Sequence, residues 1–437
     1  MKKYLNDSIK FLDKLISFKS IKDEPVSGGP FGLENKRALE YSLSVLEKLG
    51  GKTKNLDGYV GFADFFPEKE IKDENRDVFG ILLHLDVVPV DDNWDSDPFV
   101  LTQKDGKLFG RGTVDDKGPF AAILFAFKKL LDEGLKLQRQ VRFILGCDEE
   151  SGWGCMNHYK KHEAFPSFGI APDAAFPVIN YEKGILRFLL AIPKPSGIIE
   201  IQGGDRSNIV APWCNVIVKK PLKGFDNYTK EKNGYLYKIK GKGAHASTPK
   251  LGVNAIEKLL TMLEDEYSDL KPIAKLAGPE GLESITNEKY ENSDYFHIKL
   301  TSNIGKVSSD DEFIYFTFDI RYPKEISPGE ILSLAKKEGE VFQDTVVVKT
   351  PLFVDEETPL VKTLIAAYEK ATGKKGKAIS IGGGTYARAL PLAVSCGPNF
   401  EGEEELAHMA NEYISIKNLE MCIKIYYLAL KEILFKK

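Results

Sequence analysis

The chain has 437 residues, which is too long for one ordinary hydrophobic core and indicates two domains. Hydrophobic residues make up 43% and charged residues 28% of the sequence, a balance that excludes a disordered chain and a membrane-embedded one. The net charge of -4, without a long lysine or arginine block, argues against nucleic acid as a partner.

The N-terminal segment predicts an amphipathic helix rather than a targeting signal. In MKKYLNDSIKFLDKLISFKS, Leu5, Ile9 and Leu12 recur at helical spacing, and charged residues interrupt every apolar stretch. No apolar run in the sequence is long enough to span a membrane. The five cysteines are widely spaced and form no Cys-x-x-Cys pair, so we expect reduced thiols and a cytoplasmic protein.

Residues 1–180 alternate between strand and helix patterns. FGILLHLDVV (79–88) and QVRFILG (140–146) are typical of buried strands, and PFAAILFAFKKLLDEG (119–134) between them predicts a helix. Fully apolar strands in this order favour a mixed, largely parallel α/β sheet covered by helices on both faces. Ligands of such sheets bind at the carboxyl ends of the strands, and both apolar runs end in ionisable residues.

The pattern changes near residue 183, which indicates an inserted unit of the α+β type. Its predicted elements are the strands 185–193, 235–241 and 311–323 and the helix 252–266. From about residue 350 the first pattern returns, with predicted helices at 358–373 and 418–434. We therefore expect one discontinuous α/β domain, residues 1–182 and 350–437, interrupted by an α+β domain at 183–349.

HLDVVP places a histidine and a carboxylate at the end of a predicted strand. His84 and Asp86 are two residues apart, so their side chains share one face of the strand. A histidine beside a carboxylate is a common arrangement around metals. An ordinary strand-end histidine explains this motif equally well on its own.

GRGTVDDKGP presents two acids, Asp115 and Asp116, in a glycine-rich loop before a helix. A glycine-rich loop in this position often binds phosphate, but acids repel phosphate and attract cations. A surface turn is the alternative for this motif.

RFILGCDEESGWG ends a buried strand in three consecutive acids, two of which are Glu149 and Glu150. Neighbouring side chains diverge, so one glutamate could bind a metal while the other takes a proton from water. A solvated acidic turn is the alternative. Asp173, in the apolar segment APDAAFP, and His408, in ELAHMANEYI, are further candidates, because an isolated acid in apolar surroundings is costly unless it is paired or binds a metal.

Together these motifs resemble the co-catalytic metallopeptidase family that includes aminoacylases, succinyl-diaminopimelate desuccinylase, carboxypeptidase G, carnosinases and bacterial Xaa-His dipeptidases. HLDVVP, GRGTVDDKG, DEESG, PDA and HMANEYI follow in the family's order over nearly the whole chain. HLDVVPV, DDKGP and GGGTYAR are similar to the Xaa-His dipeptidase branch in particular. The resemblance implies that the discontinuous domain is catalytic, with the fold of di-metal aminopeptidases, and that the insertion is a lid domain.

The resemblance also implies a site for two divalent metal ions, for which zinc is expected and manganese or cobalt is suitable. His84 and Asp173 would hold one ion, Glu150 and His408 would hold the other, and Asp115 would bridge the two.

Two further acids would serve this chemistry. Glu149 would act as the general base, and Asp86 would orient His84. In relatives the peptide bond between the residues that match Asp115 and Asp116 is cis.

The insertion carries three residues that match substrate-binding positions of the family. His245, in GKGAHASTPK, matches the lid histidine that stabilises an oxyanion, and Asn208, in GGDRSNIVAPW, matches an asparagine that meets the substrate. Arg321, in DIRYP, would receive the free carboxylate of the substrate, a task that suits a planar guanidinium. Without the resemblance, a loop histidine is more often merely solvated, and Arg321 would simply pair with Asp319.

ISIGGGTYARALP has neither the acid nor the lysine of a nucleotide-binding loop. By resemblance it lines the substrate site, with the backbone of Gly383 and Gly384 and the side chain of Arg388 as candidates.

These assignments predict a metallodipeptidase that hydrolyses dipeptides with a free C-terminus by an activated water. An N-acyl-amino-acid amidohydrolase of the same family would use the same metal chemistry with a different pocket. A catalytically silent binder of amino-acid-like ligands would have no need of the intact Glu149. The insertion of about 165 residues is about twice as long as the lid of dimeric relatives, so we expect a monomer that binds neither membrane nor nucleic acid.

Overall fold

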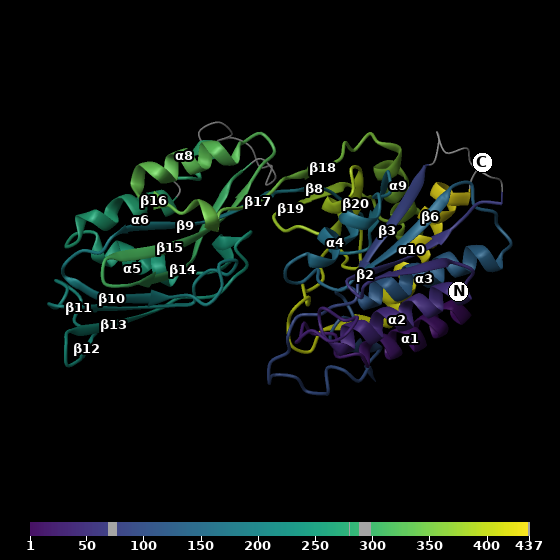
Figure 1. The fold of residues 1–437 in the computed structure, drawn as a ribbon, viewed down its shortest axis with the longest axis horizontal. Coiled ribbons are helices and arrows are strands. Elements are labelled where there is room, and N and C mark those ends of the chain that lie inside the picture. Colours follow the sequence, from purple (N-terminus) through teal and green to yellow (C-terminus); the bar gives the residue numbers. More distant parts are fainter. Residues whose placement is uncertain (69–76, 279, 288–298, 436–437) are drawn as a thin grey trace. The chain divides into compact units, whose positions relative to one another are not determined.

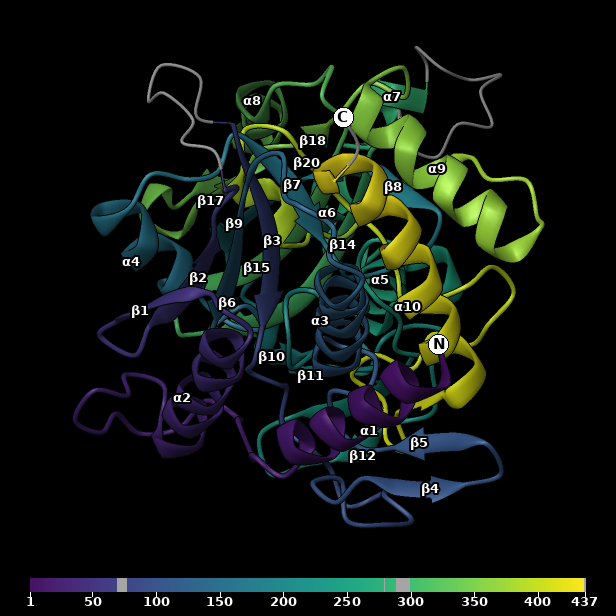
Figure 2. The same cartoon turned by 90° about the vertical axis from the view of Figure 1, so that its right-hand side faces the viewer.

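The computed structural model describes residues 1–68, 77–278, 280–287 and 299–435, which form two compact units (Figures 1 and 2). Unit 1 comprises Met1–Asn180, Val354–Ile379 and Gly384–Lys437, and unit 2 comprises Tyr181–Phe353 and Ser380–Gly383. Each unit has its own sheet and its own hydrophobic core.

Unit 1 is built on a mixed sheet. In spatial order its strands are β1 (Lys52–Leu56), β2 (Val60–Phe65), β6 (Gln140–Gly146), β3 (Val78–His84), β7 (Phe168–Ala171), β20 (Ala393–Ser395) and β8 (Val178–Glu182). β18 (Leu352–Phe353), whose residues belong to unit 2, and β19 (Ala378–Ile381) both pair with β8. The three central pairings, β6 with β3, β3 with β7 and β7 with β20, are parallel, whereas the outer pairings are antiparallel. The predicted α/β sheet is therefore confirmed.

The helices of unit 1 cover both faces of this sheet. They are α1 (Lys2–Ile16), α2 (Leu33–Lys48), α3 (Lys117–Asp132), α4 (Gly154–His162), α9 (Pro359–Thr372) and α10 (Ile416–Leu430), followed by a π-helical turn, η7 (Lys431–Phe435). Along β2, Gly61 faces α2, whereas the next residue, Phe62, packs on Tyr159 of α4. Because neighbouring strand residues point to opposite faces, α2 and α4 lie on opposite sides of the sheet. Figure 2 shows α1, α2, α3 and α10 on the near side of the strands.

Two small elements complete unit 1. A short antiparallel sheet joins β4 (Thr102–Lys104), β5 (Lys107–Phe109) and β21 (Tyr413–Ser415). A 3-10 turn, η6 (Tyr386–Ala389), packs against β3, β7 and β20.

Unit 2 is an antiparallel sheet packed against helices (Figure 1). In spatial order its strands are β12 (Thr229–Lys230), β13 (Tyr235–Lys240), β11 (Trp213–Val218), β10 (Ile198–Gly203), β14 (Thr301–Ser309), β15 (Phe313–Tyr322), β9 (Gly184–Pro193) and β16 (Glu340–Val341), with β17 (Val347–Lys349) also paired to β9. Its helices are α5 (Ala255–Leu263), α6 (Lys271–Ala277), α7 (Ser284–Asn287) and α8 (Pro328–Glu338), with 3-10 turns η2 (Pro249–Leu251), η3 (Ser268–Leu270) and η5 (Gln343–Thr345). Phe188 and Phe318 stack at 5.1 Å in its core, where the apolar side chains of strands and helices meet.

The predicted elements all appear, and the differences are at their ends. The strand expected over 79–88 ends at His84, because Val87 donates its backbone N–H to Ser20 instead of to a neighbouring strand. The helix expected over 252–266 begins at Ala255, because the side chain of Asn254 caps it. In the part of the chain that the structure describes, no helix combines the length and apolar character needed to cross a membrane.

Candidate metal centre

Three neighbouring parallel strands of unit 1 end at the same edge of the sheet, and each leads to residues singled out in the sequence. His84 is the last residue of β3 and is paired with Gly146, the last residue of β6. Glu149 and Glu150 follow β6, and Asp173 lies two residues beyond β7. The carboxyl ends of parallel strands are where such sheets bind ligands, so the fold itself gathers these side chains.

Four of the predicted ligands come together at this edge. The Nε2 atom of His84 lies 2.8 Å from Oδ1 of Asp115. The Nε2 atom of His408 lies 3.1 Å from Oδ2 of Asp115 and 3.0 Å from Oε2 of Glu150. Asp115 therefore joins the two histidines, one through each carboxylate oxygen, which is the arrangement that a bridging ligand needs. The side chain of His84 is almost wholly buried, whereas that of His408 is 53% exposed.

Asp86 organises two segments of this centre at once. Its main-chain carbonyl accepts a hydrogen bond from Nδ1 of His84 at 3.0 Å, which leaves Nε2 as the nitrogen that faces Asp115. Its carboxylate accepts the backbone N–H groups of Glu149 and Glu150 at 3.1 and 3.0 Å. The nearest approach of that carboxylate to Nδ1 of His84 is 3.7 Å, which is too long for a hydrogen bond. Asp86 thus orients His84 through its backbone and the two glutamates through its side chain.

The acids of the centre are buried beside one another, which disfavours their charged forms. Burial and then the charge of Asp115 raise the pKa of Glu150 and of Asp173 to about 7. Burial also raises the pKa of Glu149 well above its ordinary value, with smaller contributions from the neighbouring acids. Full ionisation of these carboxylates therefore requires positive charge beside them.

The pKa values of the two histidines are also raised, which favours the charged form of an imidazole. Burial on its own would lower the pKa of His84, but the hydrogen bond to Asp115 and the charges of the neighbouring acids together outweigh it, and the pKa is raised. Partial burial opposes a raised pKa at His408, but the hydrogen bonds to Asp115 and Glu150, together with the charges of these two acids, outweigh it. Protons on the imidazoles thus supply the positive charge that the acids require, and divalent cations displace such protons when they bind. Imidazole nitrogens together with carboxylate oxygens are the ligands of zinc, manganese and cobalt, so the residues present fit these ions.

Two residues to which the sequence motifs assigned no role hold this centre together. Glu412 is fully buried and accepts hydrogen bonds from Nη1 of Arg111 and the backbone N–H of Val114, both at 2.7 Å. Arg111 also donates to the main-chain carbonyl of His408 at 3.3 Å. The loop of Asp115 is therefore tied to the segment of His408. In the sequence these two residues are the arginine of GRG and the glutamate of HMANE, each of them a charged residue inside a motif.

The glycine-rich loop contributes an aromatic wall to the centre. Tyr386 is buried with its ring edge-on to that of His84, 5.9 Å between centroids, and its hydroxyl lies 2.7 Å from Sγ of Cys155. A Cβ atom at Gly384 would lie 2.6 Å from Nε of Arg388, so these two predicted substrate-binding residues of unit 1 contact each other. The bond between Asp115 and Asp116 is cis, as the family resemblance implies.

The other predicted site residues, Asn208, His245, Arg321 and Gly383, belong to unit 2. His245 forms a bridge with Ile209, and the carbonyl of Asn208 accepts the backbone N–H of Ala246 at 2.9 Å, so these two segments run side by side. The backbone N–H of Ser247 donates to Nδ1 of His245 at 3.2 Å. Because Nδ1 accepts this bond, the proton of the neutral imidazole is on Nε2.

Arg321 is connected to the same part of unit 2. Its Nη1 donates to the carbonyl of Gly382 at 2.8 Å, and a Cβ atom at Gly382 would lie 2.5 Å from Cβ of Ser247. The guanidinium also makes the salt bridge with Asp319 that the sequence offered as the alternative, 2.6 Å from Nε to Oδ1. Nε of Arg187 contacts the other oxygen of Asp319 at 2.6 Å. The binding of a substrate carboxylate by Arg321 stays a prediction.

Fold and centre together define a metallopeptidase, and comparisons with known proteins identify its family. Residues 80–432 match the model of peptidase family M20/M25/M40. "Putative dipeptidase YtjP" of Bacillus subtilis (strain 168) is 34% identical over 462 residues, which cover 98% of this chain and 97% of that protein. The chain therefore belongs to peptidase family M20/M25/M40 and is a hydrolase of peptide bonds. The resemblance drawn from the motifs is confirmed.

Solved structures share the fold. Human carnosine dipeptidase 1 superposes with a TM-score of 0.58 at 16% identity and covers 99% of this chain and 97% of its own. YXEP of Bacillus subtilis, described as a dinuclear metal-binding peptidase of the M20 family, superposes with a TM-score of 0.54 at 12% identity and covers 99% of each chain.

Proposed function

We propose that this protein is a metal-dependent dipeptidase that hydrolyses the peptide bond of dipeptides with a free C-terminus. The observation that carries the proposal is the convergence of His84, Asp115, Glu150 and His408 at the carboxyl edge of the sheet, in a chain of this family. The substrate class is supported by the names of YtjP and of human carnosine dipeptidase 1.

We assign the centre two divalent cations, with zinc as the native metal and manganese or cobalt as substitutes. His84 and Asp173 would hold one ion, Glu150 and His408 the other, and Asp115 would lie between them. When bound, the ions supply Lewis acidity that polarises a peptide carbonyl and acidifies water. The description of YXEP as dinuclear supports the number of ions.

The proton transfers fall to Glu149. Its carboxylate would take a proton from the attacking water and deliver it to the amine that leaves. Burial holds its pKa above the ordinary glutamate value, and a base works best when its pKa lies near the operating pH. The backbone N–H of Glu149, held by Asp86 at 3.1 Å, anchors this segment beside His84.

Unit 2 would supply groups that bind the substrate. Nε2–H of His245 is the donor that an oxyanion needs, because Nδ1 accepts from Ser247. Asn208 and Arg321 would bind the substrate, with Arg321 receiving its free carboxylate. Gly383, Gly384 and Arg388 complete the proposed substrate site. In this proposal unit 1 is the catalytic domain and unit 2 the lid.

We also propose that the enzyme acts as a monomer in the cytoplasm. All five cysteines are buried free thiols, as expected in a reducing compartment. One chain carries the metal cluster and both lid residues, Asn208 and His245. Sedimentation at micromolar concentration, with and without zinc, tests the monomer, and a dimer would refute it.

Hydrolysis after metal removal tests the activity. The chelator-stripped protein would receive zinc, manganese or cobalt and then Xaa-His dipeptides, other dipeptides, a tripeptide and N-acetyl amino acids. Metal-restored cleavage of dipeptides, with little cleavage of the acetylated compounds, is the expected result. Cleavage confined to acetylated amino acids would instead establish an amidohydrolase, and no turnover with any metal would favour a silent binder.

A further inference from the structure

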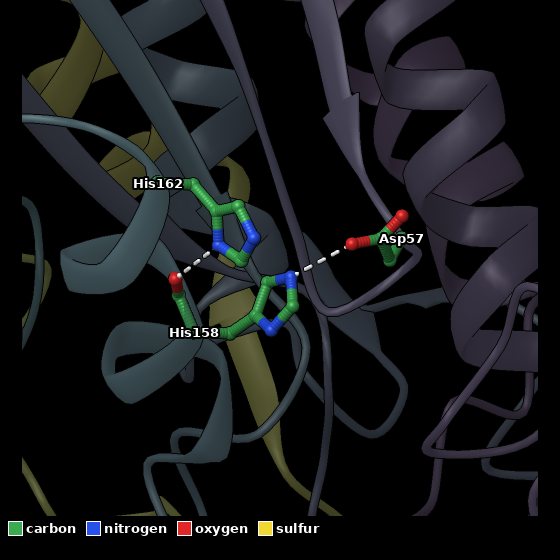
Figure 3. A group of neighbouring side chains, drawn as sticks. All are labelled: Asp57, His158 and His162. Atoms are coloured by element: carbon green, nitrogen blue, oxygen red, sulfur yellow. Dashed lines mark hydrogen bonds and ion pairs between the residues drawn. The ribbon is translucent and has the colours of Figure 1, made fainter.

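A second group of metal-binding side chains lies in unit 1, and it shares no residue with the cluster around Asp115 (Figure 3). Asp57 is in the turn between β1 and β2, and His158 and His162 are on α4. One ligand atom from each of the three lies within 4.8 Å of the others. The family motifs and the comparisons give these residues no role.

The two histidines face the same way because they are one helical turn apart. Residues separated by three or four positions are neighbours on a helix surface, so His162 lies beside His158, whereas the helical spacing places Lys160 on the opposite side and Lys161 at the flank of His158. The helix thus brings two imidazoles to one face, beside Asp57.

Hydrogen bonding and ring packing already fix the orientation of both imidazoles. Nδ1 of His162 lies 2.9 Å from the main-chain carbonyl of His158, and a carbonyl can only accept, so Nδ1 carries the proton. The neutral ring therefore keeps its lone pair on Nε2, the tautomer that a backbone carbonyl typically imposes on a metal-binding histidine. The ring of His158 stacks on Tyr59 at 4.2 Å and lies 4.3 Å from the ring of His162.

The spacing of the remaining pair suits a metal ion. Nε2 of His158 lies 3.0 Å from Oδ2 of Asp57. Two ligands bound to a tetrahedral ion at about 2.0 Å lie roughly 3.3 Å apart, so an ion requires only a small movement of this pair. The side chain of Asp57 is 72% exposed, which gives an ion access from solvent and leaves room for water as a further ligand.

We propose that Asp57, His158 and His162 bind one divalent transition-metal ion in addition to the ions of the catalytic centre. Two imidazoles and one carboxylate select zinc, cobalt, nickel or copper over magnesium and calcium, which prefer oxygen ligands alone. Such an ion ties α4 to the turn between β1 and β2.

Zinc content is the direct test. Wild-type protein, the variant His162→Gln and the matched control Lys161→Gln are dialysed against the same buffered zinc concentration, and bound zinc is counted per chain. Wild type and Lys161→Gln are expected to hold one zinc ion more than His162→Gln. The affinity for that last ion is expected to fall at least about tenfold in His162→Gln. Dipeptide hydrolysis should be the same in all three proteins, because His162 is not part of the catalytic centre.

Two further measurements separate the loss of a ligand from damage to the fold. In chelator, the three proteins are expected to unfold at the same temperature, and only wild type and Lys161→Gln should gain stability from the last zinc ion. His158→Gln should lose the same single ion as His162→Gln. Equal zinc content in wild type and His162→Gln, or an equal loss in Lys161→Gln, would overturn the proposal.

Discussion

Replacing Asp86 by asparagine tests how the catalytic centre is held together. The carboxylate of Asp86 is buried and accepts the backbone N–H groups of Glu149 and Glu150, one on each oxygen. Asparagine has nearly the same shape but only one acceptor atom. Its amide nitrogen would face one of the two N–H groups, so that bond is lost and the other becomes a bond to a neutral acceptor.

The expected cost follows from these two bonds. A hydrogen bond to a charged acceptor contributes about 1.5–3 kcal/mol, and one between neutral groups about 0.5–1.5 kcal/mol. Losing the first kind once and weakening it once amounts to roughly 3 kcal/mol of unfolding free energy. If about 2.7 kcal/mol of this is also lost from the transition state, because the proton acceptor and a ligand are loosened, kcat/KM falls about 100-fold.

A matched control lies in the same segment. Asp148 is also buried. Its carboxylate accepts a hydrogen bond from the backbone N–H of Gly154 at 2.7 Å and forms a salt bridge with Lys22 at 2.9 Å. Asp148→Asn should therefore cost stability to a similar extent without touching the N–H groups of Glu149 and Glu150.

Urea unfolding in chelator would measure both stabilities, in a Trp213→Phe background so that the remaining tryptophans report on unit 1. Dipeptide hydrolysis at saturating zinc would measure both activities. The result expected is a kcat/KM at least tenfold lower for Asp86→Asn than for Asp148→Asn. Equal activity of the two variants would refute the reasoning.

Three other changes have defined outcomes. Glu149→Gln should bind zinc as wild type does but lose about 10²–10⁴-fold in kcat, since it removes the proton acceptor; metal analysis beside dipeptide kinetics checks this, and retained turnover would contradict the role. Gly118→Ala should cost about 1–3 kcal/mol in a urea titration and impair hydrolysis, because its Cβ would lie 2.0 Å from the carbonyl oxygen of Thr113 in the loop of Asp115; a variant as stable and active as wild type would show that the loop yields. Burial lowers the pKa of Lys183 from 10.5 to about 7, so the folded chain binds fewer protons there than the unfolded chain, and stability should rise with pH between about 7 and 10.5. Urea unfolding at several pH values between about 7 and 10.5 would check this, and the unfolding free energy of Lys183→Met should rise less with pH than that of wild type. An equal rise in both proteins would show that other groups cause it.

The elements of the fold were predictable where burial is continuous along the chain. The run QVRFILG forms β6 with the predicted bounds. Its residues are buried on both faces of the sheet, apart from the partly buried Arg142, so the apolar run is continuous. Element ends depended on tertiary contacts instead. The backbone bond from Val87 to Ser20 and the cap provided by Asn254 join groups that periodicity does not reveal.

The candidate centre was predictable in its residues but not in its supports. Motif order singled out His84, Asp115 and Glu150, which the strand ends then bring together. Arg111 and Glu412 are 301 positions apart, and no local sequence pattern predicts that their side chains pair. Asp57 is similarly 101 positions from His158, although the spacing of the two histidines in HYKKH is visible in the sequence.

The pairing of Arg111 with Glu412 has a consequence for biosynthesis. Residues 181–353, the bulk of unit 2, lie between the loop of Asp115 and the segment that carries His408 and Glu412. A growing chain that still lacks this segment has His84 and Glu150 but neither the second histidine nor the carboxylate that fixes the loop. The whole of unit 2 is therefore translated before the segment that carries His408 and Glu412, so the proposed metal centre gains its second histidine and the support of its loop only late in synthesis.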